Sequence, residues 1–151
     1  MSNAEWWERI ERLAAEADAA MGLDKLLSFQ QVDLSSDSEV WRVESPLEFK
    51  MYAWLKKLGD KYGYVVKANN PRGRFRYDFE IHSRSGDLLA LVECDSAEFH
   101  HTPEQLENDR NKDEAAKAAG IPLYRYTGKE IHRDAYRCAE ETYFHIWPRG
   151  Q

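Results

Sequence analysis

The chain is predicted to be an α/β sandwich in which helices flank one central mixed sheet. Segments with helical spacing of apolar residues and segments with strand-like alternation follow the order helix, three strands, helix, strand, helix. The mostly apolar run from Leu88 to Asp95 is typical of a central strand that is covered on both faces. These two observations predict one domain with a buried sheet, preceded by a helical appendage.

Composition limits the possible classes of protein. With 151 residues and 42% hydrophobic residues, the chain can bury one core. It has no apolar run near the roughly 20 residues of a membrane-spanning helix and no signal sequence, so no membrane is expected. Two cysteines, Cys94 and Cys138, are too few for a disulfide framework, which indicates a cytoplasmic setting. The net charge of -6 disfavours a plain nucleic-acid-binding module but not an enzyme, because a metal site is itself rich in carboxylates.

Residues 1–44 are expected to form an N-terminal helix and a linker, and residues 45–151 the main domain. One apolar stripe predicts a helix from Glu5 to about Met21, formed by Trp6, Ile10, Leu13 and Ala17. The polar stretch from Asp33 to Val40 suits a linker. The Trp6/Trp7 helix either packs on the main domain or forms a surface for a homodimer or a protein partner.

The main domain opens with a helix start signal, because Ser45 can cap the helix and Pro46 suits its first position. This helix is expected to run to about Tyr62 and to stop at Gly63. A strand is expected at 64–67 and a turn at 69–73.

Strict alternation from Arg74 to His82 predicts one strand with a single buried face. Its apolar face would carry Phe75, Tyr77, Phe79 and Ile81, and its polar face Arg74, Arg76, Asp78, Glu80 and His82. After the strand from Leu88 to Asp95, Thr102-Pro103 predicts a helix to Ala119. A strand at 121–126 and a helix from near Asp134 to before Pro148 complete the domain.

Carboxylates gather at the end of the central strand. Glu93 and Asp95 are two residues apart and so share a face, and the preceding strand can bring Asp78 alongside them. Such oxygen ligands suit Mg²⁺ or Mn²⁺, which predicts a metal site of Asp78, Glu93 and Asp95. The alternative is that Asp78 and Glu93 form salt bridges with Arg74, Arg76 or Arg125. His100 could bind metal or move protons, or it could cap or pack beside the next helix.

Six short motifs carry a family resemblance: Ser45-Pro46-Leu47-Glu48, Tyr77-Asp78-Phe79, 93–100, 109–113, 119–122 and 125–131. In their order and spacing, from about Ser45 to Thr142, they resemble the very-short-patch-repair-like branch of the PD-(D/E)XK nucleases. The resemblance implies a restriction-endonuclease-like sandwich and Mg²⁺-dependent hydrolysis of DNA phosphodiester bonds. Asp78 and Glu93 would hold the metal, and Glu48 would reach in from the first helix of the domain. Asp95 and Ser96 depart from the lysine and glycine that are frequent at these two positions.

The expected catalytic residues are Glu48, Asp78, Glu93, Asp95 and His100. DNA is expected to be held by basic residues near the turn and near the site: Lys67, Arg72, Arg74, Arg76, Lys112 and Arg125. The alternative for these cations is charge balance with the carboxylates or a solvated helix face. The main hypothesis is therefore a DNA endonuclease. The second is an inactive module with a nuclease fold that binds nucleic acid or a protein partner.

Overall fold

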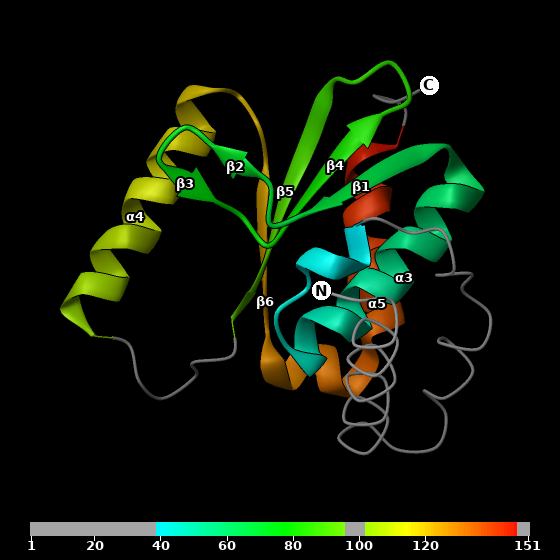
Figure 1. The fold of residues 1–151 in the computed structure, drawn as a ribbon, viewed down its shortest axis with the longest axis horizontal. Coiled ribbons are helices and arrows are strands. Elements are labelled where there is room, and N and C mark those ends of the chain that lie inside the picture. Colours follow the sequence, from blue (N-terminus) through cyan, green and yellow to red (C-terminus); the bar gives the residue numbers. More distant parts are fainter. Residues whose placement is uncertain (1–38, 96–101, 148–151) are drawn as a thin grey trace.

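The computed structural model describes residues 39–95 and 102–147. These residues form an α/β domain in which helices flank a mixed four-stranded sheet. In Figure 1, α3 and α5 lie on one side of the sheet and α4 lies on the other. The helices are η2 (Glu39–Arg42), α3 (Pro46–Tyr62), α4 (Pro103–Ala118) and α5 (Gly128–Ile146). The strands are β1 (Tyr64–Ala68), β2 (Pro71–Arg72), β3 (Phe75–Arg76), β4 (Phe79–Ser83), β5 (Leu88–Asp95) and β6 (Leu123–Thr127).

The main sheet has the order β1-β4-β5-β6, so its two central strands are β4, which covers only the second part of the strand predicted from Arg74 to His82, and β5, the predicted apolar strand. β1 and β4 are antiparallel, as are β4 and β5, whereas β5 and β6 are parallel and are joined through α4. The coarse prediction of a mixed sheet flanked by helices is therefore confirmed.

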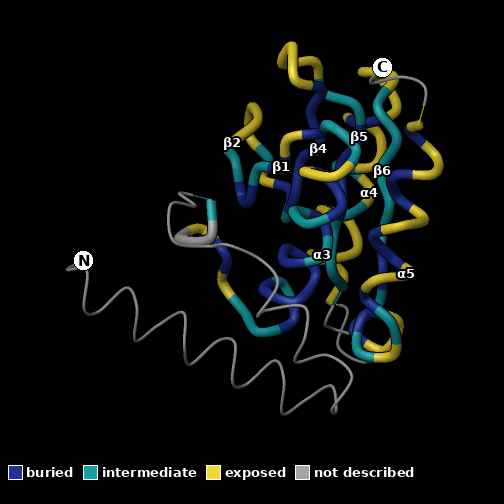
Figure 2. Tube along the Cα trace, turned by 90° about the vertical axis from the view of Figure 1, so that its right-hand side faces the viewer, coloured by how far each residue is buried: buried dark blue, intermediate teal, exposed yellow. Residues whose placement is uncertain are grey.

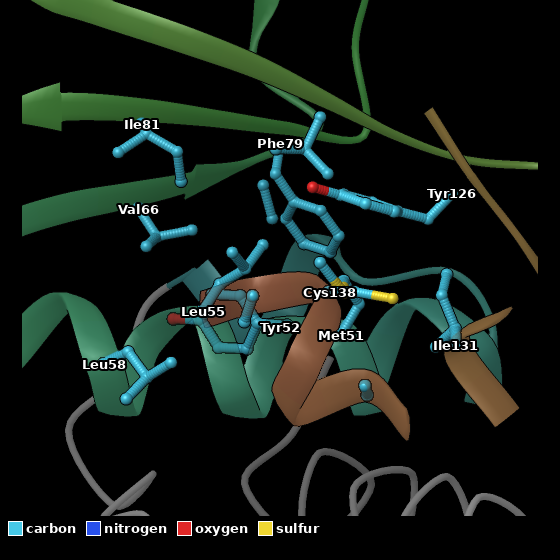
Figure 3. Close-up of a cluster of buried hydrophobic side chains, with 14 of the residues drawn as sticks. Met51, Tyr52, Leu55, Leu58, Val66, Phe79, Ile81, Tyr126, Ile131 and Cys138 are labelled. Atoms are coloured by element: carbon cyan, nitrogen blue, oxygen red, sulfur yellow. The ribbon is translucent and has the colours of Figure 1, made fainter. Parts of the chain in front are cut away.

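The main core lies between the sheet and the α3/α5 layer. Figure 3 shows Met51, Tyr52 and Leu55 of α3 facing the strand residues Phe79 and Ile81. The alternation of buried and exposed positions along α5 in Figure 2 fits a helix that covers the sheet with one face. A smaller cluster of Tyr77, Leu91 and Ala116 lies on the α4 side. No helix within 39–95 and 102–147 is long and apolar enough to cross a membrane.

Local capping signals set the helix starts. The Ser45 hydroxyl accepts from the Glu48 N–H, and Thr102 caps α4 in the same way, so both predicted starts are confirmed. α3 ends at Gly63, whose φ of 90° lies in the left-handed region that favours glycine. The last helix was expected to begin near Asp134, but α5 begins at Gly128 and has non-helical backbone at Asp134. The predicted start therefore coincides with a kink inside α5.

The predicted single strand from Arg74 to His82 is wrong, because the chain bends at Tyr77-Asp78. β3 pairs only with β2 in a separate two-stranded sheet, and β4 belongs to the main sheet. The bend reverses the faces, so Tyr77 packs in the α4-side cluster while Phe79 packs in the main core. The extended backbone on both sides of the bend preserves the sequence alternation, which hides the reversal.

Residues 39–44, which belong to the predicted N-terminal helix and linker, pack on the domain. Val43 is 0% exposed and belongs to the main core. The Glu39 carboxylate accepts a 2.8 Å hydrogen bond from the Ala68 N–H, and the Arg42 carbonyl accepts one from the Asn69 side chain. The packed domain thus extends at least to Glu39. The Trp6/Trp7 helix lies outside the described residues.

Candidate metal and active site

Asp78 lies at the edge of the sheet, at the bend that leads into β4. Phe79 is the partner of Val92 in the antiparallel β4–β5 pair, which places Asp78 beside Glu93 near the end of β5. The Asp78 Oδ2 atom accepts a 2.6 Å hydrogen bond from the Cys94 N–H. Main-chain pairing and this bond together hold the Asp78 carboxyl against β5.

Negative charge crowds the Asp78 carboxyl. Burial, followed by the charges of Glu93 and Glu48, raises the pKa of Asp78 to about 8. A hydrogen bond with the Glu93 carboxyl also favours the protonated form, whereas the Cys94 N–H favours the ionised form. Burial likewise raises the pKa of Glu48. These three carboxyls come from α3, the bend before β4, and β5, so the fold brings them together from distant parts of the chain.

Glu48 is held by two neighbours at the start of α3. Its Oε2 atom accepts from the Ser45 hydroxyl at 3.2 Å, and its Oε1 atom accepts from the Asn69 side chain at 3.2 Å. Asn69 follows β1 with a φ of 48°, and its N–H donates to the Asp78 carbonyl. Asn69 therefore links Glu48 to the bend that carries Asp78.

Lys112 reaches the same edge from α4. Its ammonium donates to the Glu93 Oε1 atom at 2.8 Å and to the Arg76 carbonyl at 3.0 Å. The two side chains are only 14% and 13% exposed. The Tyr77 hydroxyl in turn donates to the Lys112 carbonyl, so α4 is tied to the segment before Asp78. One ammonium thus lies beside Glu93, while burial and then the charges of Glu93 and Glu48 still raise the pKa of Asp78.

The chemistry of this donor set fits a hard divalent cation. Carboxylate oxygens are the ligands that Mg²⁺ and Mn²⁺ prefer, and a cation would offset both the burial and the neighbouring charges that raise the pKa of Asp78. Within the described ranges, however, no three His, Cys, Asp or Glu side chains already converge as a metal-binding group. Ion binding would therefore require the side chains to adjust, with Glu93 turning from Lys112.

The remaining predicted acid-base residues are placed less centrally. Asp95 is half-buried at the end of β5, where its Cα is paired with that of Thr127. His100 lies outside the described residues. The structure thus brings Glu48, Asp78 and Glu93 together, with Asp95 two residues farther along the same strand.

Most of the basic residues predicted to bind DNA have protein partners. Arg72 pairs with Glu80, Arg76 with Glu44, and Arg125 with Asp113 and Asp109. Lys67 is half-buried on β1, and Arg74 is exposed. No ion pair within residues 39–95 and 102–147 joins an arginine to Asp78 or Glu93. The expected alternative of arginine salt bridges at those two acids thus has no counterpart among the ion pairs of the described residues.

Two residues that organise the site were not identified from the sequence in these roles. Asn69 was assigned to a turn, but its side chain holds Glu48. Lys112 was assigned to DNA binding, but its ammonium contacts Glu93. An Asn-Asn pair before proline predicts only a turn, and Lys112 lies 19 residues from Glu93, so no local pattern reveals either contact.

Comparisons with known proteins identify no relatives. No family model, no curated protein and no solved structure matches the chain.

Proposed function

We propose that this chain is a metal-dependent endonuclease that hydrolyses DNA phosphodiester bonds, with the restriction-endonuclease-like variant of the α/β sandwich. The observation that carries the proposal is the Asp78 carboxyl, half-buried beside Glu93 and Glu48 with its pKa raised to about 8. Structural ion pairs neutralise buried carboxylates, whereas here carboxyls are gathered with too little positive charge. Sites that bind catalytic cations have this character.

Asp78 and Glu93 would hold Mg²⁺ or Mn²⁺, with Asp95 as a further ligand on the same strand. When bound, such an ion supplies a hydroxide near neutral pH and neutralises charge on the phosphate. The protein contributes orientation. The Cys94 N–H directs one oxygen of Asp78, and Asn69 directs Glu48.

Lys112 supplies a positive charge beside Glu93. If Glu93 turns to an ion, the Lys112 ammonium still donates to the Arg76 carbonyl and so stays at the site. An ammonium at this place can donate to a phosphate oxygen or to the attacking water. In this scheme Lys112 acts at the reacting centre rather than along the DNA backbone. Two free cysteines, Cys94 and Cys138, agree with the reducing cytoplasmic setting that belongs to the same proposal.

Plasmid cleavage tests the proposal. Purified wild-type protein, Asp78→Asn and the control Asp60→Asn would be incubated with supercoiled plasmid and Mg²⁺ or Mn²⁺. The control Asp60→Asn makes the same chemical change as Asp78→Asn. The Asp60 side chain is 65% exposed and pairs with Lys56 on α3. We expect the control to nick DNA like the wild type. The cleavage activity of Asp78→Asn should fall more than about 100-fold, because the loss of a residue that only supports a metal ligand already lowers activity about 10 to 100-fold.

Equal cutting by all three proteins would identify a contaminating nuclease and remove the support for the proposal. A second candidate, a non-cutting module of the same fold, is favoured by two observations. Lys112 already pairs with Glu93, and no three ligands converge within residues 39–95 and 102–147. If no protein cuts but the wild type retards DNA in a gel, this second function replaces the first.

A further inference from the structure

A second buried charge cluster lies on β4, outside the carboxylate site. Glu80 is 0% exposed, and its carboxylate accepts from Arg72 Nε at 2.9 Å and Arg72 Nη2 at 3.0 Å. The His82 Nε2 atom lies 2.8 Å from the Glu80 Oε1 atom, and the Asn70 side chain also donates to this carboxylate. Burying a carboxylate is costly unless it is fully paired, so this arrangement calls for a structural or functional reason.

The partner of Glu80 belongs to the β2–β3 hairpin. Each of the two strands has only two residues, and a ribbon of this size is not stable by itself. The two-bond contact from Arg72 to Glu80 fastens its first strand to the main sheet. The second strand is held at Arg76, whose side chain pairs with Glu44 and whose carbonyl accepts from Lys112.

The outer end of the hairpin is basic. Three arginines, Arg72, Arg74 and Arg76, lie within the five residues 72–76, although the net charge of the whole chain is -6. Arg72 and Arg76 are engaged in the ion pairs above, whereas Arg74 makes no ion pair within residues 39–95 and 102–147. The Arg74 guanidinium instead lies over the Phe75 ring, 5.0 Å from its centroid. Stacking on an aromatic ring orders a guanidinium and leaves its edge donors available for a phosphate.

The hairpin is also adjacent to the candidate site. β3 ends at Arg76, and Asp78 follows after a single residue. Figure 1 shows the hairpin on the α4 side of the sheet, and the bond from the Tyr77 hydroxyl to the Lys112 carbonyl places this segment against α4. A strand of DNA whose phosphate reaches the carboxylates would therefore pass close to Arg74.

We propose that the β2–β3 hairpin is a DNA-gripping wing in which Arg74 contacts a backbone phosphate and Glu80 is a positioning residue that acts through Arg72. This inference rests on the proposed DNA endonuclease function and divides the basic residues into two roles. Arg72 anchors the wing, and Arg74 makes the contact. Glu80 touches no DNA in this scheme, yet its loss weakens the contact that Arg74 makes.

Equilibrium binding to a labelled duplex, measured by fluorescence anisotropy in EDTA, tests the wing without requiring hydrolysis. We expect Arg74→Ala to weaken binding about 3 to 10-fold and to reduce the slope of log K against log salt by about 0.9, the value for one phosphate contact. The control Arg84→Ala removes an exposed arginine just after β4, at the end of that strand opposite Asp78. It should leave both the affinity and the slope unchanged.

Coupling between Glu80 and Arg74 tests the positioning role. Glu80→Gln should weaken binding about as much as Arg74→Ala, and the double variant should be no weaker than either single variant. If Glu80 had a purely structural role, Glu80→Gln would lower the melting temperature, but Arg74→Ala would still weaken DNA binding further in the double variant. If Glu80→Gln does not fold, Arg72→Lys replaces it, because lysine keeps the charge and loses the two-bond geometry.

Two results would overturn this inference. If Arg74→Ala binds DNA with unchanged affinity, the hairpin is not a DNA-binding wing. If the losses of affinity add up in the double variant, Glu80 does not position Arg74. Both can be observed while Asp78-dependent plasmid cleavage persists, so the endonuclease proposal would survive them. Conversely, loss of the endonuclease proposal through a lack of cleavage would leave the binding measurements readable.

Discussion

Replacing Asp78 with asparagine should make the stability of the metal-free protein less dependent on pH. Asparagine has nearly the same shape and keeps an oxygen that can accept from the Cys94 N–H. It removes the ionisable group whose pKa rises from 3.8 to about 8 in the folded protein. At about 1.4 kcal/mol per pH unit, this rise corresponds to an upper limit of about 6 kcal/mol. Because part of this rise comes from the neighbouring charges of Glu93 and Glu48, we expect a smaller measured difference in the free energy of unfolding, roughly 2 to 4 kcal/mol.

The sign follows from the proton count of the two states. Below about pH 4, Asp78 is protonated in both the folded and the unfolded chain. Between about pH 4 and pH 8, the unfolded chain releases this proton while the folded protein keeps it, so the free energy of unfolding falls as pH rises. Above about pH 8, Asp78 is ionised in both states and its cost is constant. Asp78→Asn should therefore be more stable than the wild type at pH 8, and the difference should shrink toward pH 4.

Urea unfolding in EDTA, followed by circular dichroism at several pH values, measures this difference. Asp60→Asn is the matched control and should follow the wild-type profile, because its side chain is 65% exposed. Adding Mg²⁺ at about pH 8 should stabilise the wild type and not Asp78→Asn, since an ion that binds only the folded state shifts the equilibrium by mass action. Parallel pH profiles for the wild type and Asp78→Asn would refute the claim that burial and neighbouring carboxyls raise the pKa of Asp78 in the folded protein.

Two further substitutions test the packing. Val43→Ala should lower the free energy of unfolding by about 2 kcal/mol, because Val43 is 0% exposed in the main core. A loss below about 0.5 kcal/mol in urea unfolding would mean that residues 39–44 are not part of the domain. Gly59→Ala would place a Cβ atom 2.7 Å from the Tyr143 hydroxyl, so it should cost about 1 to 3 kcal/mol. An exposed helical glycine would instead gain up to about 1 kcal/mol on the same change, so a rise in melting temperature would contradict this packing.

Local signals in the sequence predict much of the fold. Ser45-Pro46 and Thr102-Pro103 each supply a capping side chain and a first-turn proline, and the helices begin there. The bounds expected for the apolar run from Leu88 to Asp95 coincide with those of β5. These features depend on residues that are neighbours in the chain, so a single sequence contains the information needed to predict them.

The candidate site is predicted less completely because it depends on contacts between distant residues. The carboxylates could be recognised as a set, since Glu93 and Asp95 share a face of one strand. Glu48 joined that set through the family resemblance, and the structure places its carboxyl near Asp78. The contact between Lys112 and Glu93 joins a helix to a strand across 19 residues, and no periodic pattern indicates it.

The amino-acid order by itself determined where α3 and α4 begin, that the run from Leu88 to Asp95 is a central strand, and which acids are available for a site. Only the tertiary structure decided that the chain bends at Asp78, because alternation in β3 and β4 continues through the bend without a change of phase. The bend separates a small hairpin from the sheet and turns Tyr77 toward α4 and Phe79 toward α3 and α5. The physical reason is that periodicity reports which side chains share a face of a local segment, whereas the packing partners of that face are chosen by the rest of the molecule.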